Sequence, residues 1–529
     1  MTDKRDVILI GAGHNGLVCA NYLARAGRKV LVIEAGGSPG GAAASREFAP
    51  GYTVSACAQW LYQLHPAVCR DLQLERFGLQ WAARDLASVL LDTGGQHLRL
   101  LGAQVEGEGI SRADIDTWRK FHGRTGKYAK LLAKVFEQRP PRLVESTLRD
   151  RVALAGLGLG LKMLGRDEMS DLMRIVLTNM YDLMEENFDS PQLKALLSFD
   201  SVLGSRMGPR TPGTVFGYLH RRSGEIFGYT GVAQVRGGMG SVGDALAASA
   251  RARGVEILLG SKVAGIDTSH GRAVGVTLAS GEQLQAQVVV SSADPATTFA
   301  RLVGFRNMET GMARRVSQVR SAGSAAKLHL ALKGLPRFTG LDDTGLGQRL
   351  VIAPDMNYIE RAFNAVKYGE YSPEPALDIS IPSIHDPALA PAGDHVLSAI
   401  VQFAPHQPPG GWDGPAAGPG ETHRECFTRL LLDQLEQYAP GIRQQVVGCQ
   451  LLTPADLERD FGMSGGHWHH AELSLDQVLI MRPFPGATRY ASGLDGLYLC
   501  GAGCHPGGGV MGLAGKNAAR EIIRREAGA

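Results

Sequence analysis

Three histidines within four positions form a dense group of side chains that could do chemistry: His467, His469 and His470. Imidazole titrates near neutral pH, so it can act as a general acid or base, and it also ligates metal ions. If this segment is a strand, His467 and His469 point to one side and line a cavity together. The alternative is that they are turn and surface residues.

A second reactive group lies near the C-terminus. Cys500 and Cys504 could contribute to a metal site only with further ligands nearby, and the sequence contains no second cysteine pair, so we expect no metal ion. The seven cysteines are scattered and odd in number, which argues against a disulfide framework. His505 follows directly and is a further candidate for catalysis.

Glycines near the N-terminus indicate a dinucleotide site that would position such groups. The apolar run 6–10 is typical of a buried parallel strand, and Gly11-x-Gly13-x-x-Gly16 follows it immediately. A helical pattern and a second apolar run ending in Glu34 complete a βαβ unit. Gly11 permits the tight turn, Gly13 lets the backbone approach a pyrophosphate, and Gly16 allows close helix packing. The Glu34 carboxylate favours a free ribose 2′-hydroxyl, hence NAD or FAD over NADP.

A second G-x-G-x-x-G, residues 238–243, could bind NAD and make the protein a two-nucleotide reductase. The strand before it, residues 232–235, is short and weakly apolar. The strand after the helix ends at Leu258 without the acidic residue that a ribose needs. We therefore expect no second nucleotide site.

Composition narrows the class of protein. A chain of 529 residues is too long for one core, and a net charge of +3 without basic runs argues against a nucleic-acid partner. The N-terminal lead is neither a signal peptide nor an anchor. The apolar stretch 152–164 is too short to span a bilayer, and we expect a buried core helix, with a membrane-surface helix as the alternative. The expected location is cytoplasmic, with peripheral membrane contact left open.

The continuation of the first motif carries a family resemblance. After Glu34 comes a paired glycine, Gly40-Gly41, as in the extended FAD fingerprint of the amine oxidase and phytoene desaturase superfamily. Further segments resemble the phytoene desaturase-like group that includes pyridine nucleotide-disulfide oxidoreductase domain-containing protein 2. The segments that carry this resemblance are 11–27, 40–52, 378–402, 465–483 and 501–520.

The resemblance implies FAD as cofactor and a two-domain α/β flavoprotein. A Rossmann-like FAD-binding domain would be built from the discontinuous segments 1–75, 231–300 and 489–529. Residues 76–230 and 301–488 would form a substrate domain with a mixed sheet and helices. Strand patterns at 325–332, 377–381 and 395–404 and helical patterns at 114–136 and 167–188 agree with this division.

The motifs and the resemblance together imply a set of FAD-binding residues. Many relatives place an arginine after the glycine pair, where this chain has Ala42, and Arg46 is a candidate stand-in. Many flavoproteins have Gly-Asp where this chain has Gly501-Ala502, so backbone N–H groups or a water must substitute. The predicted set is Gly11, Gly13, His14, Asn15, Gly16, Glu34, Ala35, Gly40, Gly41, Ala42, Val263, Gly501, Gly503, Gly509, Val510, Met511 and Gly512.

The resemblance also suggests the reaction. We expect hydride transfer from a C–H bond of a lipophilic small molecule to flavin N5, with oxygen or a quinone as the electron acceptor. Methionines at helical spacing after residue 166 favour a packed core, and the alternative is a pocket for a lipophilic substrate, because methionine side chains adapt in shape. The predicted catalytic residues are His505, His467 and His469, together with Lys327, which would hold a water at flavin N5 as in amine oxidases. Covalent flavin attachment through His505 or Cys504 is left open.

Three alternatives share this fold. They are an amine or amino-acid oxidase, a redox-neutral flavin isomerase, and a non-enzymatic interaction protein of the GDP-dissociation-inhibitor type. Proteins of the last class have lost flavin-site features, whereas Gly11, Gly13, Gly16 and Glu34 are intact here. An enzyme is therefore favoured, and the sequence does not decide its oligomeric state.

Overall fold

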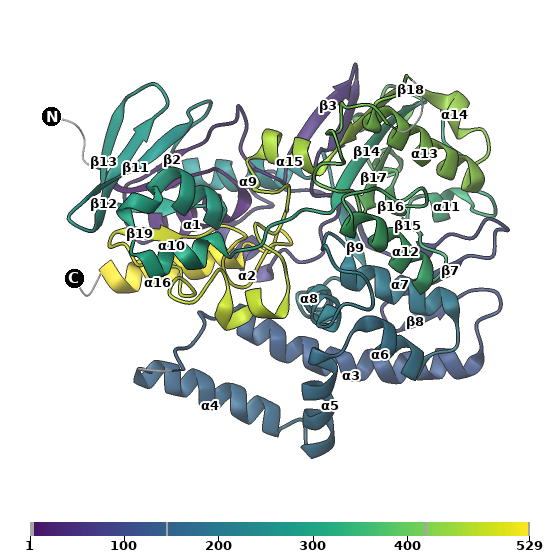
Figure 1. Cartoon of the computed structure of the whole chain (residues 1–529), viewed down its shortest axis with the longest axis horizontal. Helices are drawn as coiled ribbons and strands as arrows, with labels where there is room; N and C mark the ends of the chain where they lie inside the picture. The colour runs from purple at the N-terminus through teal and green to yellow at the C-terminus, as the bar shows by residue number, and fades with distance from the viewer. Residues whose placement is uncertain (1–4, 144–145, 417–419, 527–529) are drawn as a thin grey trace.

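The computed structural model describes residues 5–143, 146–416 and 420–526, and it is organised around two sheets (Figure 1). The first is the predicted Rossmann-like sheet. Its central strand β1 (Arg5–Ile10) pairs in parallel with β2 (Val30–Ile33) on one side and β13 (Gln283–Ser291) on the other. The remaining strands of this sheet are β10 (Glu256–Leu258), β11 (Val263–Ser269), β12 (Arg272–Leu278) and β19 (Leu497–Leu499).

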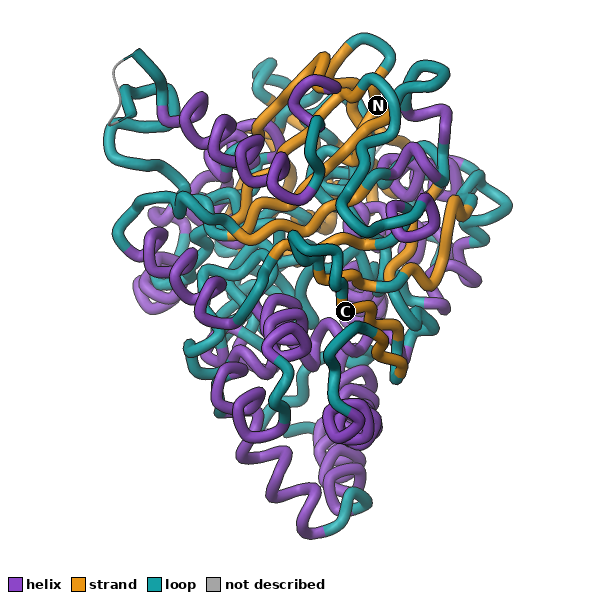
Figure 2. The backbone as a smooth tube through the Cα atoms, turned by 90° about the vertical axis from the view of Figure 1, so that its right-hand side faces the viewer, coloured by secondary structure: helices purple, strands orange, loops and turns teal. Residues whose placement is uncertain are grey.

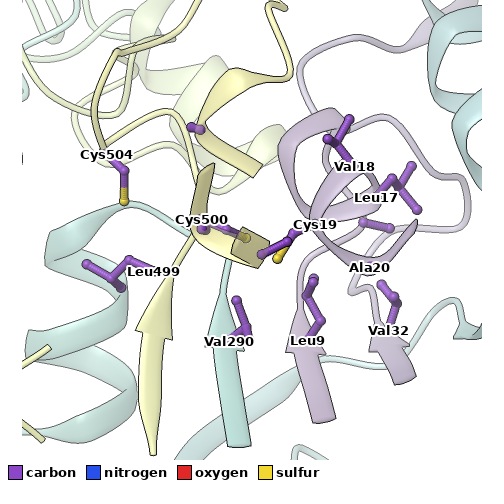
Figure 3. Close-up of a cluster of buried hydrophobic side chains, with 14 of the residues drawn as sticks. Leu9, Leu17, Val18, Cys19, Ala20, Val32, Val290, Leu499, Cys500 and Cys504 are labelled. Carbon is purple, nitrogen blue, oxygen red and sulfur yellow. The ribbon is translucent and has the colours of Figure 1, made fainter. Parts of the chain in front are cut away.

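Three helices from distant parts of the chain pack together beside this sheet. They are α1 (His14–Arg25), α9 (Gly240–Arg251) and α16 (Leu513–Glu526). β1 and β2 are apolar at successive positions because both faces of a parallel sheet are covered. Figure 3 shows Leu9, Val32, Val290 and Leu499 on four neighbouring strands, next to the buried residues of α1. Segments far apart in sequence thus share one core.

The second sheet has eight strands and is mixed, because only β6 and β15 pair in parallel. The three strands predicted for this domain are confirmed as β14, β17 and β16. In sheet order the strands are β18 (Val446–Leu452), β14 (Ala325–Leu332), β17 (His395–Gln402), β16 (Ala376–Ser380), β15 (Arg349–Ile352), β6 (Ser88–Leu90), β7 (Leu98–Leu101) and β8 (Gln104–Glu106).

The two-domain α/β architecture predicted from the sequence is confirmed. The core of the first sheet also includes Val303, Val316 and Phe484, which lie outside the predicted segments of the FAD domain. The domain boundaries themselves stay a prediction. Short connecting pairs are β3 (Ser45–Ala49) with β4 (Tyr52–Ser55) and β5 (Trp81–Leu86) with β9 (Val232–Val235).

Helices cover the second sheet and extend from it. The predicted helix over 167–188 is interrupted, because the Asn179 side chain caps a new helix by accepting from the Asp182 N–H. The helices of this region are α3 (Arg112–Phe136), α5 (Arg166–Leu177), α6 (Met180–Asn187), α7 (Pro191–Val202), α8 (Thr214–Ile226), α11 (Asp343–Leu346), α12 (Met356–Lys367), α13 (His423–Tyr438) and α14 (Ile442–Gln445); α2 (Pro66–Leu72) and α10 (Thr310–Ser317) lie with the first sheet.

The prediction of a buried core helix over residues 152–164 is wrong. Helix α4 (Leu148–Lys162) forms, but Leu148 is 79% exposed and Val152 is 64% exposed. Asp150 is the one residue that the structure buries in this helix. An apolar run in the sequence shows that a helix has side chains suited to burial. Whether another element covers those side chains depends on the tertiary fold. In the described ranges no helix has both the length and the apolarity to cross a membrane.

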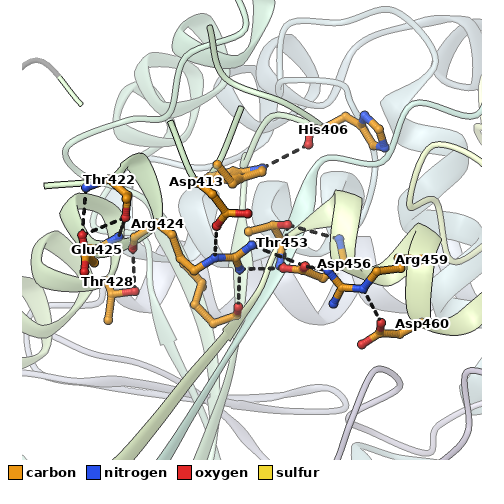
Figure 4. A network of polar contacts seen from close by, with 12 residues as sticks. His406, Asp413, Thr422, Arg424, Glu425, Thr428, Thr453, Asp456, Arg459 and Asp460 are labelled. Atoms are coloured by element: carbon orange, nitrogen blue, oxygen red, sulfur yellow. Dashed lines mark hydrogen bonds and ion pairs between the residues drawn. The ribbon is translucent and has the colours of Figure 1, made fainter. Parts of the chain in front are cut away.

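A polar network fixes helix α15 (Pro454–Phe461), whose end reaches the candidate site (Figure 4). Thr453 and Asp456 form a capping box at its start. Arg424 donates to Asp456 at 2.6 Å and to Asp413 at 3.1 Å. The network thereby ties α15 to α13 and to the Pro- and Gly-rich loop that follows β17. Residues 417–419 of this loop lie outside the described ranges.

Candidate functional site

A cavity of about 760 Å³ opens where β1, β2 and β13 end. This is the edge of an open parallel sheet at which nucleotides bind, because the loops after the strands diverge there. Nine of the predicted FAD-binding residues line it: Gly11, Gly13, His14, Asn15, Glu34, Ala35, Gly41, Ala42 and Val263.

The first glycine turn has the shape that a dinucleotide requires. Gly11 has φ +91°, a conformation that favours glycine. A Cβ at Gly16 would lie 2.3 Å from the Gly11 carbonyl oxygen, so the helix packs against the strand only with glycine here. A Cβ at Gly13 would meet only the Ser292 hydroxyl, at 3.7 Å. The space beside Gly13 is therefore open toward the cavity.

Glu34 joins the turn to the end of β2. Its carboxylate accepts from the Ala12 N–H at 2.6 Å and from the Gly36 N–H at 2.8 Å. These bonds hold a negative charge at the cavity wall beside the start of α1. The position suits a carboxylate that accepts from ribose hydroxyls.

Buried polar atoms without partners show that the cavity fits FAD. His14 Nε2, Asn15 Oδ1 and His470 Nδ1 are buried, and within the described part of the chain no group hydrogen-bonds to them. Buried polar groups in native proteins are normally paired, so a bound molecule is expected to supply the partners. The first N–H groups of α1 also point toward this space and favour an anion such as a pyrophosphate.

The other predicted FAD-binding residues do not line the cavity. Of the C-terminal glycine segment, Ala502 lines the cavity, whereas a Cβ at Gly501 would lie 2.3 Å from the Ser292 carbonyl oxygen. A Cβ at Gly509 would lie 2.1 Å from Gln63 Oε1. The predicted residues that do not line the cavity are Gly16, Gly40, Gly501, Gly503, Gly509, Val510, Met511 and Gly512. Their contact with FAD stays a prediction.

Sequence reasoning did not name the opposite wall. There the lining comes from the end of α15, from the segment after it and from the residues after β13. The histidine segment was predicted to line a cavity, which is correct, but its spacing selected His467 and His469 and not Trp468 and His470. The lining residues that we did not predict include Ser261, Lys262, Ser292, Ala293, Thr297, Arg301, Phe461, Met463, Trp468, His470 and Ala502.

The strand expected at the histidine segment does not form. Residues 465–470 are turns, with Gly465 and Gly466 at φ +66° and +70°, so strand alternation does not apply. Trp468 and His470 line the cavity instead of His467 and His469. The structure buries both of the latter and burial holds their pKa values low, that of His467 at about 3.

Arg482 holds this segment in place. Its guanidinium is buried and donates to the backbone oxygens of His469 at 2.5 Å and Ala502 at 2.9 Å. One side chain thus fixes the histidine segment against the C-terminal glycine loop. Nothing in the local sequence around Arg482 indicated this role.

Lys327 and His505 do not line the cavity. Lys327, on β14, is fully buried and donates to Gln59 Oε1 and to Ser398 Oγ. Burial lowers the pKa of Lys327 to about 7. His505 Nε2 lies 3.0 Å from the Val135 carbonyl oxygen at the end of α3. Among the described residues no cluster of three His, Cys, Asp or Glu side chains is arranged to hold a metal ion.

Comparisons with known proteins agree with this site. A family model described as flavin containing amine oxidoreductase matches residues 16–374. Pyridine nucleotide-disulfide oxidoreductase domain-containing protein 2 of Mus musculus is 34% identical, over 98% of this chain and 93% of its own. Phytoene desaturase (lycopene-forming) of a Paracoccus species is 26% identical, over 97% of this chain and 95% of its own.

The solved structure of cyclohexylamine oxidase from Brevibacterium oxydans has the same fold. The two chains superpose with a TM-score of 0.59 at 15% identity, over 99% of this chain and 100% of that one. The predicted family and the predicted FAD cofactor are both confirmed. This chain belongs to the flavin-containing amine oxidoreductase family, and its cofactor is FAD.

Proposed function

We propose that this oxidoreductase takes a hydride from a C–H bond of an uncharged, lipophilic small molecule to flavin N5, with oxygen or a quinone as electron acceptor. The observation that carries the proposal is the apolar character of the wall opposite the glycine turn. Leu302, Phe461, Met463 and Trp468 line it. Apolar and aromatic side chains favour an apolar ligand because its burial removes water from both surfaces.

The ionisable groups that line the cavity support an uncharged substrate. Burial lowers the pKa of His14 to about 4 and also lowers that of His470, so both imidazoles are neutral at neutral pH. The carboxylate of Glu458 pairs with Arg301 at 3.1 Å and with His406 at 2.8 Å. A cationic amine would have to compete with these existing partners for the carboxylate.

The protein supplies positions and the cofactor supplies the redox chemistry. When bound, FAD would accept two electrons and a proton from one C–H bond, and the substrate would lose a second proton to water as its double bond forms. Gly13 and the start of α1 would hold its pyrophosphate, and Glu34 its ribose. Met463, Trp468 and His470 would place the substrate and exclude water. A relative named phytoene desaturase acts, by its name, on an apolar polyene, which agrees with this assignment.

Anaerobic reduction of the flavin tests the proposal. The FAD-loaded protein is mixed with apolar polyenes and terpenes in micelles, with primary amines and with amino acids, and loss of the oxidised-flavin absorbance is followed. We expect an apolar compound to reduce the flavin at least about tenfold faster than any amine. Reoxidation rates with oxygen and with a soluble quinone then identify the acceptor.

A pair of tryptophan variants ties the result to the cavity. Trp468→Ala should slow reduction by the apolar substrate while FAD content is kept. Trp81→Ala, on β5 and outside the cavity lining, should leave the rate unchanged. Reduction by amines alone, with none by apolar compounds, would show that the proposed substrate class is wrong.

A further inference from the structure

Helices α4 and α5 form a hairpin that projects from the body of the protein. Figure 1 shows both below α3, away from the two sheets, and Figure 2 shows the helical part narrowing toward one end. α4 begins at a capping box in which the Thr147 side chain and Asp150 satisfy each other's backbone N–H groups. The helix is therefore well defined although the body of the protein covers little of it.

The surface of this hairpin is apolar. Its exposed apolar residues recur at intervals of four or seven, which places them on one side of each helix as a stripe. Monomeric soluble proteins rarely expose apolar patches of this kind unless the patch contacts a partner or a membrane. The stripe on α4 consists of Leu148, Val152, Leu159 and Met163, and that on α5 of Met169, Met173 and Leu177.

Basic residues lie at both ends of α4. Arg149 and Arg151 are in its first turn, and Lys162 and Arg166 lie where it meets α5. The first turn of α5 also carries Asp167 and Glu168, and Glu168 pairs with Lys127 at 2.5 Å. The acidic residue of the first turn, Asp150, is buried against Arg139 and Arg489 and does not offset them at the surface. A cavity of about 330 Å³ at the base of the helix has a mixed lining that includes Arg139, Arg149, Arg520 and Arg524 and the carboxylates of Glu137, Asp150 and Glu521.

The charges distinguish the two occupants that an apolar stripe could have. A second copy packed along α4 would bring basic ends onto basic ends in either the parallel or the antiparallel arrangement. An anionic lipid surface would instead attract both ends while the stripe enters the boundary between headgroups and acyl chains. The pattern of apolar side chains flanked by Arg and Lys is that of an interfacial helix.

We propose that the α4–α5 hairpin docks this protein on an anionic membrane surface. The stripe of α4 and α5 would lie in the interface, and Arg149, Arg151, Lys162 and Arg166 would contact lipid headgroups. The docking does not depend on the identity of the substrate.

Vesicle flotation of the full-length, FAD-loaded protein tests this proposal. Vesicles of phosphatidylcholine alone are compared with vesicles that also contain phosphatidylglycerol, at about physiological salt. We expect flotation with the anionic vesicles and at least about tenfold less with the neutral ones, because each basic residue near an anionic surface contributes to binding. V152E/L159E should reduce flotation at least about tenfold, since it places two charges in the stripe.

Two further variants control for charge and for folding. R151E/K162E, which keeps the apolar stripe, should lose flotation on anionic vesicles to the level seen with neutral ones. V447E/Y368E adds the same charges at residues that are 54% and 79% exposed outside the hairpin, and it should float like the parent. FAD content and melting temperature report whether each variant is folded.

Three results would overturn the proposal. The first is that the parent protein does not float with anionic vesicles. The second is that V152E/L159E floats like the parent. The third is that sedimentation without lipid shows a dimer that V152E/L159E dissociates, which would identify the stripe as an interface between two copies.

Discussion

Two glycine turns with the same spacing have opposite surroundings in this molecule. Beside the first, residues 11–16, a Cβ at Gly13 would meet open space and one hydroxyl at 3.7 Å. Beside the second, residues 238–243, a Cβ at Gly240 would lie 2.7 Å from the Ser45 N atom. The first turn faces the cavity and the second is filled by protein.

The backbone amides differ in the same way. At the second turn the Met239 N–H donates to Ser55 Oγ at 3.0 Å, and the Gly240 N–H donates to Ser45 Oγ at 2.9 Å. These serine hydroxyls accept hydrogen bonds from the backbone N–H groups, as the oxygens of a pyrophosphate would at the first turn. A Cβ at Gly243 would also lie 2.5 Å from Gly40 Cα, so the second turn supports the glycine pair behind the cavity wall. The same spacing thus serves ligand binding in one place and packing in the other.

The largest expected effect is on FAD binding at the first turn. Gly13 has an ordinary extended backbone, so Gly13→Val can fold, but its side chain would occupy the space through which the pyrophosphate approaches. We expect FAD affinity to fall by roughly a thousandfold or more, about 4 kcal/mol. Flavin titration of the apoprotein measures the affinity.

Gly37→Val is the matched control for this change. A Cβ at Gly37 meets nothing within 4 Å, and this residue does not line the cavity. It should bind FAD like the parent. Tight FAD binding by Gly13→Val would mean that the first turn does not receive the pyrophosphate.

The next effect is a pH dependence that the first turn carries and the second turn, which has no histidine, does not. His14 is neutral in the fold because burial lowers its pKa from 6.5 to about 4. The folded state therefore binds fewer protons than the unfolded state between these values. As pH falls from about 6.5 to 4, the FAD-free protein should lose about 3 kcal/mol through this group. His14→Asn should remove that loss, as measured by urea unfolding across this pH range.

The exposed His270, at a surface turn, provides the control. His270→Asn keeps a residue type that tolerates the left-handed backbone at this position, where φ is +49°. Its stability profile should follow that of the parent. A His14→Asn profile as steep as the parent's would show that other groups control the acid response.

These two turns also show what the sequence could predict. Near Gly11 every local signal agreed: apolar strand, glycine spacing, helix and Glu34, all within one contiguous unit. Near Gly240 the weak strand and the missing acid argued correctly against a second nucleotide site, but nothing predicted that Ser45 and Ser55 would cap the helix. Those contacts join residues almost 200 positions apart.

The same limit explains the misplaced residues. The apolar run of α4 predicted a helix correctly and its burial wrongly, because cover comes from other elements. His470 reaches the cavity through a turn that begins at Gly465, a left-handed position that the assumed strand excluded. Lys327 lies on a predicted strand, but its distance from the cavity depends on how the two sheets meet.

Crowding at the second turn predicts a stability effect without a binding effect. Gly240→Val would force its branched side chain against Ser45, and such overpacking typically costs about 1–3 kcal/mol. Urea unfolding should show this loss, while FAD affinity changes by less than about threefold. Gly311→Val, on α10 where a Cβ meets nothing within 4 Å, separates crowding from the general cost of valine in a helix. A large loss of FAD affinity in Gly240→Val without destabilisation would show that the second turn also contributes to FAD binding.

The smallest expected effect isolates the serine caps themselves. Ser55→Ala removes the acceptor of the Met239 N–H and should lower the free energy of unfolding by about 1 kcal/mol, as for other helix caps. FAD affinity should not change, because this amide never faces the cavity. Ser55→Thr keeps a hydroxyl acceptor and should recover most of the loss. If Ser55→Ala instead weakened FAD binding at unchanged stability, the second turn would contribute to cofactor binding. The proposed difference between a ligand-binding turn and a packing turn would then be wrong.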